Sequence, residues 1–267
     1  MLRLFSQENM KNLIFISTWF SLIASAFAAG KRGIGAPWDS VGSDLDAIPA
    51  GQKVSWIYNW ESYNPPGGRQ FEYVAMLRTG HQDDIDRFYQ NMPHNGARTL
   101  LCLNEPDHPE QADLTPEQAA DIWRRHCWPQ KVQRGIRLGA PAITNGPQGL
   151  PWLQRFLDIT RDVSPDFVTT HWYGTDGNDF IRHVQRVRDI SQKAVWVTEL
   201  AHTRDNIYDQ RGLMQQVRQW MDNTWWVERY AWFSCSRKKE NNINPSSRLL
   251  DQNGGMTDLM YKYLYDA

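Results

Sequence analysis

Residues 167–201 read FVTTHWYGTDGNDFIRHVQRVRDISQKAVWVTELA and contain a complete strand–helix–strand unit. The two ends, 167–174 and 194–201, are rich in β-branched and aromatic residues, so we expect two strands there. Between them, residues 179–190 place apolar side chains at helical spacing, which predicts a helix. A strand, a helix and a second strand of these lengths are typical of parallel β/α architecture.

The same alternation continues along the rest of the chain. Apolar or β-rich runs also occur at 32–38, 53–60, 71–79, 99–105, 137–144 and 227–234. Helices are expected at 115–123, 151–161, 211–222 and 256–265. Thr115, Pro116 and Glu117 supply a cap, a proline and an early acid, and Thr257 is a second candidate cap.

Eight strands in about 240 residues predict an α/β fold, a (β/α)8 TIM barrel, in a single domain over residues 29–267. An open doubly wound sheet is the alternative, and such a sheet usually carries a glycine-rich phosphate turn after its first strand. Residues 33–38, GIGAPW, have two of the three glycines and then Trp38, so a nucleotide-binding sheet is rejected. We find no linker and no internal repeat of 20–50 residues.

The overall composition excludes several classes of protein. Hydrophobic residues make up 41 % and charged residues 22 % of the chain, which indicates a globular protein. The formal net charge of −1 leaves no broad basic field, so neither nucleic acid nor an anionic membrane is an expected partner. The chain has 13 tryptophans, more than the core of one domain needs, which raises the question of an aromatic binding surface.

The first 28 residues have the pattern of a signal peptide. Lys11 precedes an apolar run at 13–29, and Ala26-Phe27-Ala28 forms a cleavage signature, with Ala24-Ser25-Ala26 as a competing site. A membrane anchor is the alternative, but the run is slightly short to span a bilayer. We expect a secreted, monomeric protein, extracellular or in the cell wall, with no membrane contact after cleavage.

The three cysteines are Cys102, Cys127 and Cys235. In an oxidising compartment we expect one disulfide and one buried thiol, and the sequence leaves the pairing open. Cys102 lies inside an apolar run and is a candidate for the free thiol.

Two of the expected strands end on a glutamate. In a β/α barrel, chemistry lies at the carboxyl ends of the strands. Glu105 ends the fourth strand and Glu199 ends the seventh, so the two side chains face each other across the barrel mouth. Such a pair suits glycosidic cleavage, because one carboxylic acid protonates the leaving oxygen while the other attacks or activates water. Asn104 can bond a sugar hydroxyl, and Tyr173 can hold the ionised carboxylate.

The plainer interpretation makes both glutamates strand-end caps of the following helices. It would be preferred for a single glutamate. Two of them, three strands apart in Asn-Glu-Pro and Thr-Glu settings, favour the catalytic pair.

Four segments in this order resemble glycoside hydrolase family 128 of clan A, which includes the fungal alkali-sensitive-linkage-type cell-wall proteins. They are LCLNEPD (101–107), THWYG (170–174), VWVTELA (195–201) and RYAWFS (229–234). The closing segment, 249–264, is also similar, so the resemblance runs from about residue 32 to 264. It implies a barrel that hydrolyses β-1,3-glucan with retention.

The resemblance also implies roles for individual residues. Glu105 corresponds to the acid/base and Glu199 to the nucleophile, with Asn104, His171 and Tyr173 as supporting residues. We therefore expect a secreted, endo-acting β-1,3-glucanase that uses double displacement and needs no cofactor. Its partner is a β-1,3-glucan polysaccharide or oligosaccharide. Exo action, glucan binding without turnover and activity on a β-1,4-glycan stay open as alternatives.

The aromatic residues divide into two groups. Trp38, Trp60 and Trp232 fall at strand ends with Tyr173, where we expect them to line the cleft and stack on sugar rings, and Phe233 is a further candidate there. Trp172 alternates with Tyr173 and should point away from the cleft. Core packing of helices on strands is expected for Trp123, Trp152, Trp196 and Trp220.

Other catalytic chemistry lacks support in the sequence. The seven histidines include no H-E-x-x-H pattern, so no metal site is expected. The G-x-S-x-G pattern of serine hydrolases is also missing.

Overall fold

The computed structural model describes residues 30–49, 53–238 and 244–266. Its sheet has the strand order β3-β2-β1-β9-β8-β7-β6-β5-β4, and all its paired strands are parallel. β3 and β4 lie at the two ends of this order but are separated only by Val74 in the chain. The sheet therefore curls into a nearly closed barrel, which confirms the expected TIM-barrel fold.

The strands coincide with the eight expected runs. They are β1 (Arg32–Gly35), β2 (Val54–Tyr58), β3 (Glu72–Tyr73), β4 (Ala75–Leu77), β5 (Thr99–Cys102), β6 (Arg137–Gly139), β7 (Phe167–Gly174), β8 (Ala194–His202) and β9 (Val227–Trp232). Only the run at 71–79 is divided, because its first half pairs with β2 and its second half with β5.

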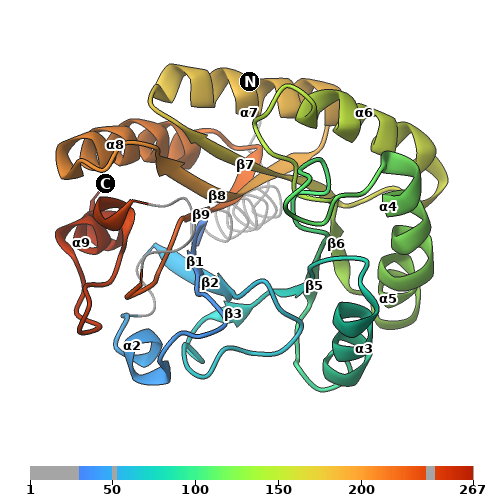
Figure 1. Ribbon diagram of the computed structural model, residues 1–267, viewed down its shortest axis with the longest axis horizontal. Helices are drawn as coiled ribbons and strands as arrows, with labels where there is room; N and C mark the ends of the chain where they lie inside the picture. Colours follow the sequence, from blue (N-terminus) through green and yellow to red (C-terminus); the bar gives the residue numbers. More distant parts are fainter. Residues whose placement is uncertain (1–29, 50–52, 239–243, 267) are drawn as a thin grey trace, which may run out of the picture.

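Helices surround the strands in Figure 1. They are α2 (Gly42–Asp46), α3 (Gln82–Asn91), α4 (Pro116–Ile122), α5 (Trp128–Arg134), α6 (Gly149–Ile159), α7 (Gly177–Ser191), α8 (Ile207–Asn223) and α9 (Asp258–Tyr265). Thr115 caps α4 in a reciprocal pair of hydrogen bonds with Gln118, and Thr257 caps α9, as the sequence predicts. A π-helical turn at Trp123–Cys127 carries α4 on into α5.

Aromatic side chains fill the interior of the barrel. Phe167 stacks on Trp196 with ring centroids 4.1 Å apart, and Trp56 lies 5.3 Å from Trp196. Trp196 thus faces the interior of the barrel, and the expectation that it packs a helix against a strand is wrong. Trp123 and Trp152 do occupy the layer between strands and helices, and both pack on Phe156.

The expected disulfide is absent. Cys102, Cys127 and Cys235 are all free thiols, and all three are buried. Burial raises the pKa of Cys235 to about 12, so this thiol stays protonated and behaves as a small apolar side chain.

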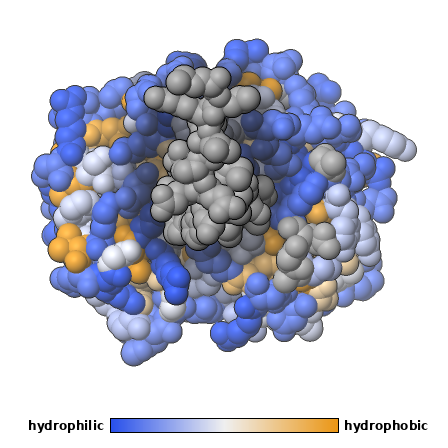
Figure 2. All heavy atoms as spheres, turned by 180° about the vertical axis from the view of Figure 1, so that it is seen from behind, coloured by the Kyte–Doolittle hydropathy of each residue, from blue (hydrophilic) through white to orange (hydrophobic). Residues whose placement is uncertain are grey.

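The predicted signal peptide at 1–28 lies outside the described residues. Within the part of the chain that the structure describes, no helix is long and apolar enough to cross a membrane. Figure 2 shows the face opposite to the view of Figure 1, where the coloured residues are mostly hydrophilic and the hydrophobic ones form separate patches.

Candidate active site

A cleft of about 750 Å³ opens at the carboxyl ends of the strands, and Glu105 and Glu199 both line it. The loops after β1, β2 and β9 contribute an aromatic side that contains Trp38, Trp60 and Phe233. The loops after β5 and β6 contribute a polar side that contains His108, Gln111, Asn145 and Gln148. These two groups of strands lie on opposite sides of β7 and β8 in the sheet order, so the cleft has two chemically different sides. Glu105 follows β5 on the polar side, and Glu199 belongs to β8.

The pairing of β7 with β8 determines the position of Glu199. Thr170 is opposite Val197, but the next residue, His171, is opposite Glu199, so the ladder skips Thr198. This irregularity brings the Glu199 carboxylate beside the His171 ring. Side chains alternate along a strand, so Tyr173 lies on the same face as His171. Trp172 points the other way and packs on Phe180 of α7, as expected.

Glu105 lies just beyond β5 on a strained backbone. Leu103 and Glu105 both adopt left-handed conformations, with φ of 67° and 42°. Each such conformation costs a non-glycine residue about 1–3 kcal/mol. Hydrogen bonds to the segment after β6 offset this cost, since the Glu105 N–H donates to the Ala142 carbonyl at 2.8 Å and the Ala142 N–H donates to the Leu103 carbonyl at 3.1 Å.

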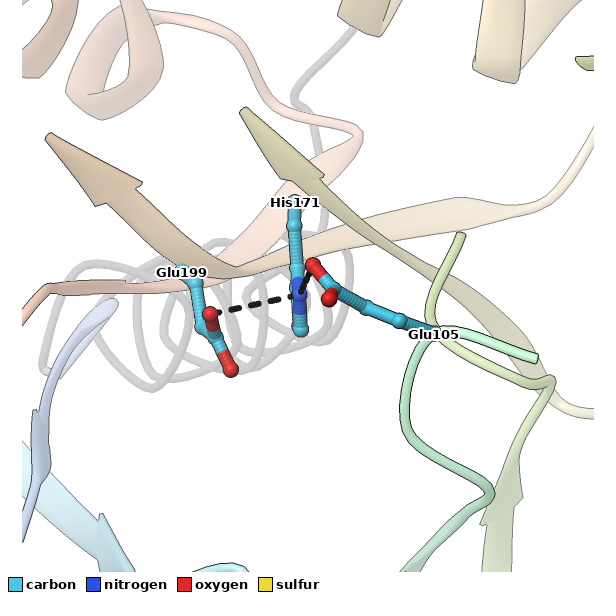
Figure 3. A group of neighbouring side chains, drawn as sticks. All are labelled: Glu105, His171 and Glu199. Carbon is cyan, nitrogen blue, oxygen red and sulfur yellow. Dashed lines mark hydrogen bonds and ion pairs between the residues drawn. The ribbon is translucent and has the colours of Figure 1, made fainter. Parts of the chain in front are cut away.

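His171 lies between the two acids, as Figure 3 shows. Its Nδ1 atom is 2.7 Å from Oε1 of Glu105 and 3.4 Å from Oε2 of Glu199. One atom from each of the three side chains fits within a mutual separation of 4.8 Å. This proximity agrees with the carboxyl separation of about 5–5.5 Å in retaining glycosidases and is shorter than the 6.5–9.5 Å of inverting ones.

Both oxygens of Glu199 accept a hydrogen bond. The Trp60 indole N–H donates to Oε1 at 2.7 Å, and an indole can only donate. The Tyr173 hydroxyl donates to Oε2 at 2.6 Å. Burial raises the pKa of Tyr173 well above its usual value, so the hydroxyl keeps its proton. The pattern therefore suits an ionised and firmly oriented Glu199.

The three central groups titrate together. Burial and the charge of Glu105 raise the pKa of Glu199, although His171, Tyr173 and Trp60 oppose the shift. Burial also acts to raise the pKa of Glu105, but the hydrogen bond and charge of His171 outweigh it, and the net shift is downward. Burial acts to lower the pKa of His171, yet the two carboxylates raise it overall. The directions of these shifts favour an ionised Glu105 and a protonated His171 in the free site.

Asn104 offers an unused acceptor to the cleft. Its side chain is buried, and its Nδ2 donates to Oε1 of Gln111 at 3.3 Å. Its Oδ1 is also buried and has no hydrogen-bond partner among the described residues. A buried oxygen without a partner is costly, so this atom is suited to accept a hydroxyl from a bound ligand.

Most of the residues expected at the cleft are in place, with one exception. Trp38, Trp60, Asn104 and Tyr173 line the cleft, and His171 lies beneath the acids. The expectation that Trp232 lines the cleft is wrong. Its ring is 1 % exposed, and its indole N–H donates to the Ser247 carbonyl at 3.0 Å.

Phe233 occupies the cleft position in place of Trp232. Its ring lies 5.3 Å from that of Trp60 and 5.9 Å from that of Tyr173, between centroids. Because side chains alternate, the residue next to the expected one faces the cleft.

Sequence reasoning missed two supporting residues. Thr198 Oγ1 lies 3.0 Å from Nε2 of His171 and fixes the orientation of the ring. Asn145 bonds both backbone groups of Tyr173, since its Oδ1 accepts from the N–H and its Nδ2 donates to the carbonyl. Thr198 lies within the VWVTELA segment, but nothing in that segment marks it as a partner of His171, and Asn145 lies in none of the motifs. The irregular pairing at Thr198 has no sequence pattern that could reveal it.

Glu105, His171 and Glu199 are close enough to hold a metal ion. The polar atoms of these side chains, however, already form hydrogen bonds with one another and with neighbouring residues. Both ring nitrogens of His171 have hydrogen-bond partners, and both Glu199 oxygens accept from Trp60 and Tyr173. The arrangement fits proton transfer better than metal ligation.

Comparisons with known proteins agree on one family. A family model described as glycosyl hydrolase catalytic core matches residues 35–263. The chain is 26 % identical over 246 residues to alkali-sensitive linkage protein 1 of Schizosaccharomyces pombe. The matched region covers 88 % of this chain and 44 % of that protein. The chain thus spans less than half the length of this curated relative.

Solved structures of glycoside hydrolase family 128 are similar over most of the chain. An exo-β-1,3-glucanase from Aureobasidium namibiae has a TM-score of 0.82 at 27 % identity, covering 89 % of this chain and 97 % of that one. A curdlan-specific exo-β-1,3-glucanase from Blastomyces gilchristii has a TM-score of 0.71 at 30 % identity, covering 81 % and 95 %. An endo-β-1,3-glucanase from Sorangium cellulosum has a TM-score of 0.75 at 26 % identity, covering 89 % and 98 %.

Proposed function

The chain belongs to the glycosyl hydrolase catalytic core family, in glycoside hydrolase family 128, and we propose that it hydrolyses β-1,3-glucan with retention of configuration. The observation that carries the proposal is the close group of Glu105, His171 and Glu199 in an open cleft. Relatives described as β-1,3-glucanases, one of them in complex with laminaripentaose, support the choice of substrate.

In the first step, Glu199 attacks the anomeric carbon and forms a covalent glycosyl ester. Trp60 and Tyr173 hold both of its oxygens and stabilise the attacking carboxylate. Glu105 gives a proton to the departing glycosidic oxygen, so the leaving sugar departs as a neutral alcohol. The free oxygen of Asn104 is placed to accept a hydroxyl of the sugar under attack.

In the second step, Glu105 acts as a base. It takes a proton from water, whose oxygen attacks the anomeric carbon of the ester and releases Glu199 as a carboxylate. Two displacements at one carbon restore its original configuration.

His171 supplies the proton that the first step needs. Transfer of the Nδ1 proton to Oε1 of Glu105 across 2.7 Å converts an ion pair into a neutral acid and a neutral imidazole. A bound sugar removes water from around Glu105, which disfavours its charged form and drives this transfer. Thr198 keeps the ring oriented while the proton moves.

The shape of the cleft favours cleavage inside a glucan chain. Lining residues extend from Trp38 on one side of the acids to Gln148 on the other, so sugar units have contacts on both sides. Exo action is the second candidate, since the Aureobasidium relative with a TM-score of 0.82 is described as an exo-enzyme. Secretion through the signal peptide at 1–28 and a monomeric state complete the proposal.

Product analysis tests this function. Purified protein is incubated with laminari-oligosaccharides, and products are followed by chromatography and by NMR of the newly formed anomeric centre. A ladder of short oligomers with β-configuration supports endo action with retention, and a single small product supports exo action. Initial α-products contradict retention, and binding without products supports a glucan-binding protein. Parallel assays on β-1,4-glucan and β-1,4-mannan detect activity on other glycans.

A further inference from the structure

A side-chain clamp joins the two loops that form the polar side of the cleft. The Thr144 N–H and hydroxyl both donate to the Asp107 carboxylate, at 3.0 Å to Oδ1 and 2.5 Å to Oδ2. Gln148 Nε2 donates to the Asp107 carbonyl at 3.3 Å. Asp107 lies two residues after Glu105, whereas Thr144 and Gln148 belong to the loop between β6 and α6.

The backbone around the clamp leaves little space for a different arrangement. A Cβ atom added to Gly149, the first residue of α6, would lie 2.3 Å from the Thr144 carbonyl and 3.2 Å from Asp107 Oδ2. The amino end of α6 therefore packs directly against the clamp. Thr144 is itself buried, and its hydroxyl also accepts the N–H of Gly146 at 3.1 Å, so the whole loop is cross-linked.

The clamp lies next to the strained segment that presents the acid. Leu103 and Glu105 hold left-handed backbone conformations, and the Ala142 backbone bonds this segment from one side. Asp107 secures the same segment from its other end, and the His108 N–H donates back to the Glu105 carbonyl at 3.0 Å. Without the Asp107 carboxylate, the segment keeps its attachment before Glu105 and the Gln148 bond to the Asp107 carbonyl, but loses both bonds to Thr144.

We propose that Asp107 is a positioning residue that acts through Glu105: by binding Thr144 it fixes the acid at the distance from the leaving oxygen that proton transfer requires. The inference rests on the proposed function. It concerns only the steps in which Glu105 gives or takes a proton, and it leaves the attack by Glu199 unchanged.

Two substrates separate this role from a general structural one. Laminari-oligosaccharides have a sugar leaving group that needs acid assistance, whereas a dinitrophenyl β-laminaribioside has a leaving group that departs without it. The value of kcat/KM reports the first displacement for both. We expect Asp107→Ala to lower kcat/KM about 100-fold on the oligosaccharide, because a misplaced catalytic group costs about that factor in rate. On the aryl glycoside, which needs no acid assistance, kcat/KM should fall less than about 3-fold.

Further variants keep the test decisive if Asp107→Ala does not fold. Thr144→Val removes the hydroxyl, which donates to Asp107 and accepts from Gly146, but keeps the backbone bond to Asp107. Asp107→Asn keeps an acceptor, so both variants should show the same selective loss in weaker form. Asp166→Ala is the matched control, because Asp166 accepts the Leu138 N–H at 2.9 Å and fastens the other end of β6. It should affect both substrates equally.

The outcomes are distinct. A selective loss on the oligosaccharide in the clamp variants supports the positioning role. An equal loss on both substrates, or no loss, overturns it while the proposed function stands. A wild-type protein that cleaves neither substrate contradicts the proposed function itself.

Discussion

The Nδ1 atom of His171 lies 2.7 Å from Oε1 of Glu105, and solvent does not reach the histidine side chain of this pair. The ring is fully buried, and its other nitrogen bonds Thr198 at 3.0 Å. These contacts hold the imidazole in place, with Nδ1 closer to Glu105 than to Oε2 of Glu199, which lies at 3.4 Å. This pairing makes the charge state of the acid, which follows β5, depend on a residue of β7, two strands away in the sheet.

Replacement of either acid should abolish hydrolysis. We expect Glu199→Gln and Glu105→Gln each to lower reducing-sugar release from linear β-1,3-glucan by at least about 100-fold, since each removes an essential group. Circular dichroism should show an unchanged fold. Glu117→Gln is a matched control, because this exposed glutamate pairs with Arg155 on the surface and does not line the cleft. Near-wild-type activity in either acid variant would refute the assignment.

Tyr173→Phe should shift the acid limb of the pH profile. The lost hydroxyl stabilises the ionised form of Glu199, so its removal raises the pKa of Glu199 further. Because Glu199 must be ionised to attack, activity should be lost at a higher pH than in the wild type as the pH is lowered. The value of kcat should also fall about 10-fold. The measurement is kcat/KM as a function of pH, and an unmoved acid limb would contradict this role.

His171→Asn should move the basic limb to lower pH. In the wild type the transferable proton is lost at the pKa of His171, which the two carboxylates raise. In the variant the proton is held by the Glu105 carboxyl alone. Loss of His171 raises the pKa of this carboxyl, but a carboxyl starts from an ordinary value below that of a histidine. Activity should therefore fall at a lower pH. A basic limb that stays in place or moves up would show that His171 does not supply the proton.

Trp38→Ala should weaken the binding of long glucans. Trp38 lies on the rim of the cleft, with 66 % of its surface exposed, and is free to stack on a sugar ring. Loss of one such contact should raise KM about 3- to 10-fold and leave kcat little changed. Trp225→Ala is the control, since Trp225 is 79 % exposed but does not line the cleft. Equal effects of the two substitutions would rule out a specific stacking role.

Trp232→Ala should act on stability and not on substrate affinity. This side chain is 1 % exposed and bonds the Ser247 carbonyl, so its removal leaves a large cavity and an unpaired carbonyl. The free energy of unfolding should fall by about 3–5 kcal/mol, measured by denaturant titration. A stable variant with a raised KM would contradict this role and indicate that Trp232 contacts the substrate.

Local patterns in the sequence determined much of the barrel. The period of the apolar residues located the strands and the main helices, and Thr115 and Thr257 marked helix starts because a hydroxyl cap depends only on nearby residues. The two glutamates at strand ends placed the acid pair, because parallel strands present their carboxyl ends at one edge. Each inference used interactions that are local or follow from strand direction.

Only the tertiary structure decided how those residues meet. The skipped Thr198 aligns His171 with Glu199, and the turn through Leu103 and Glu105 aims the acid at the same ring. Phe233 lines the cleft whereas Trp232 is buried, since one position along a strand reverses the direction of a side chain. These features arise from hydrogen bonds between segments far apart in the chain, and no pattern within one segment records which distant partner it will find.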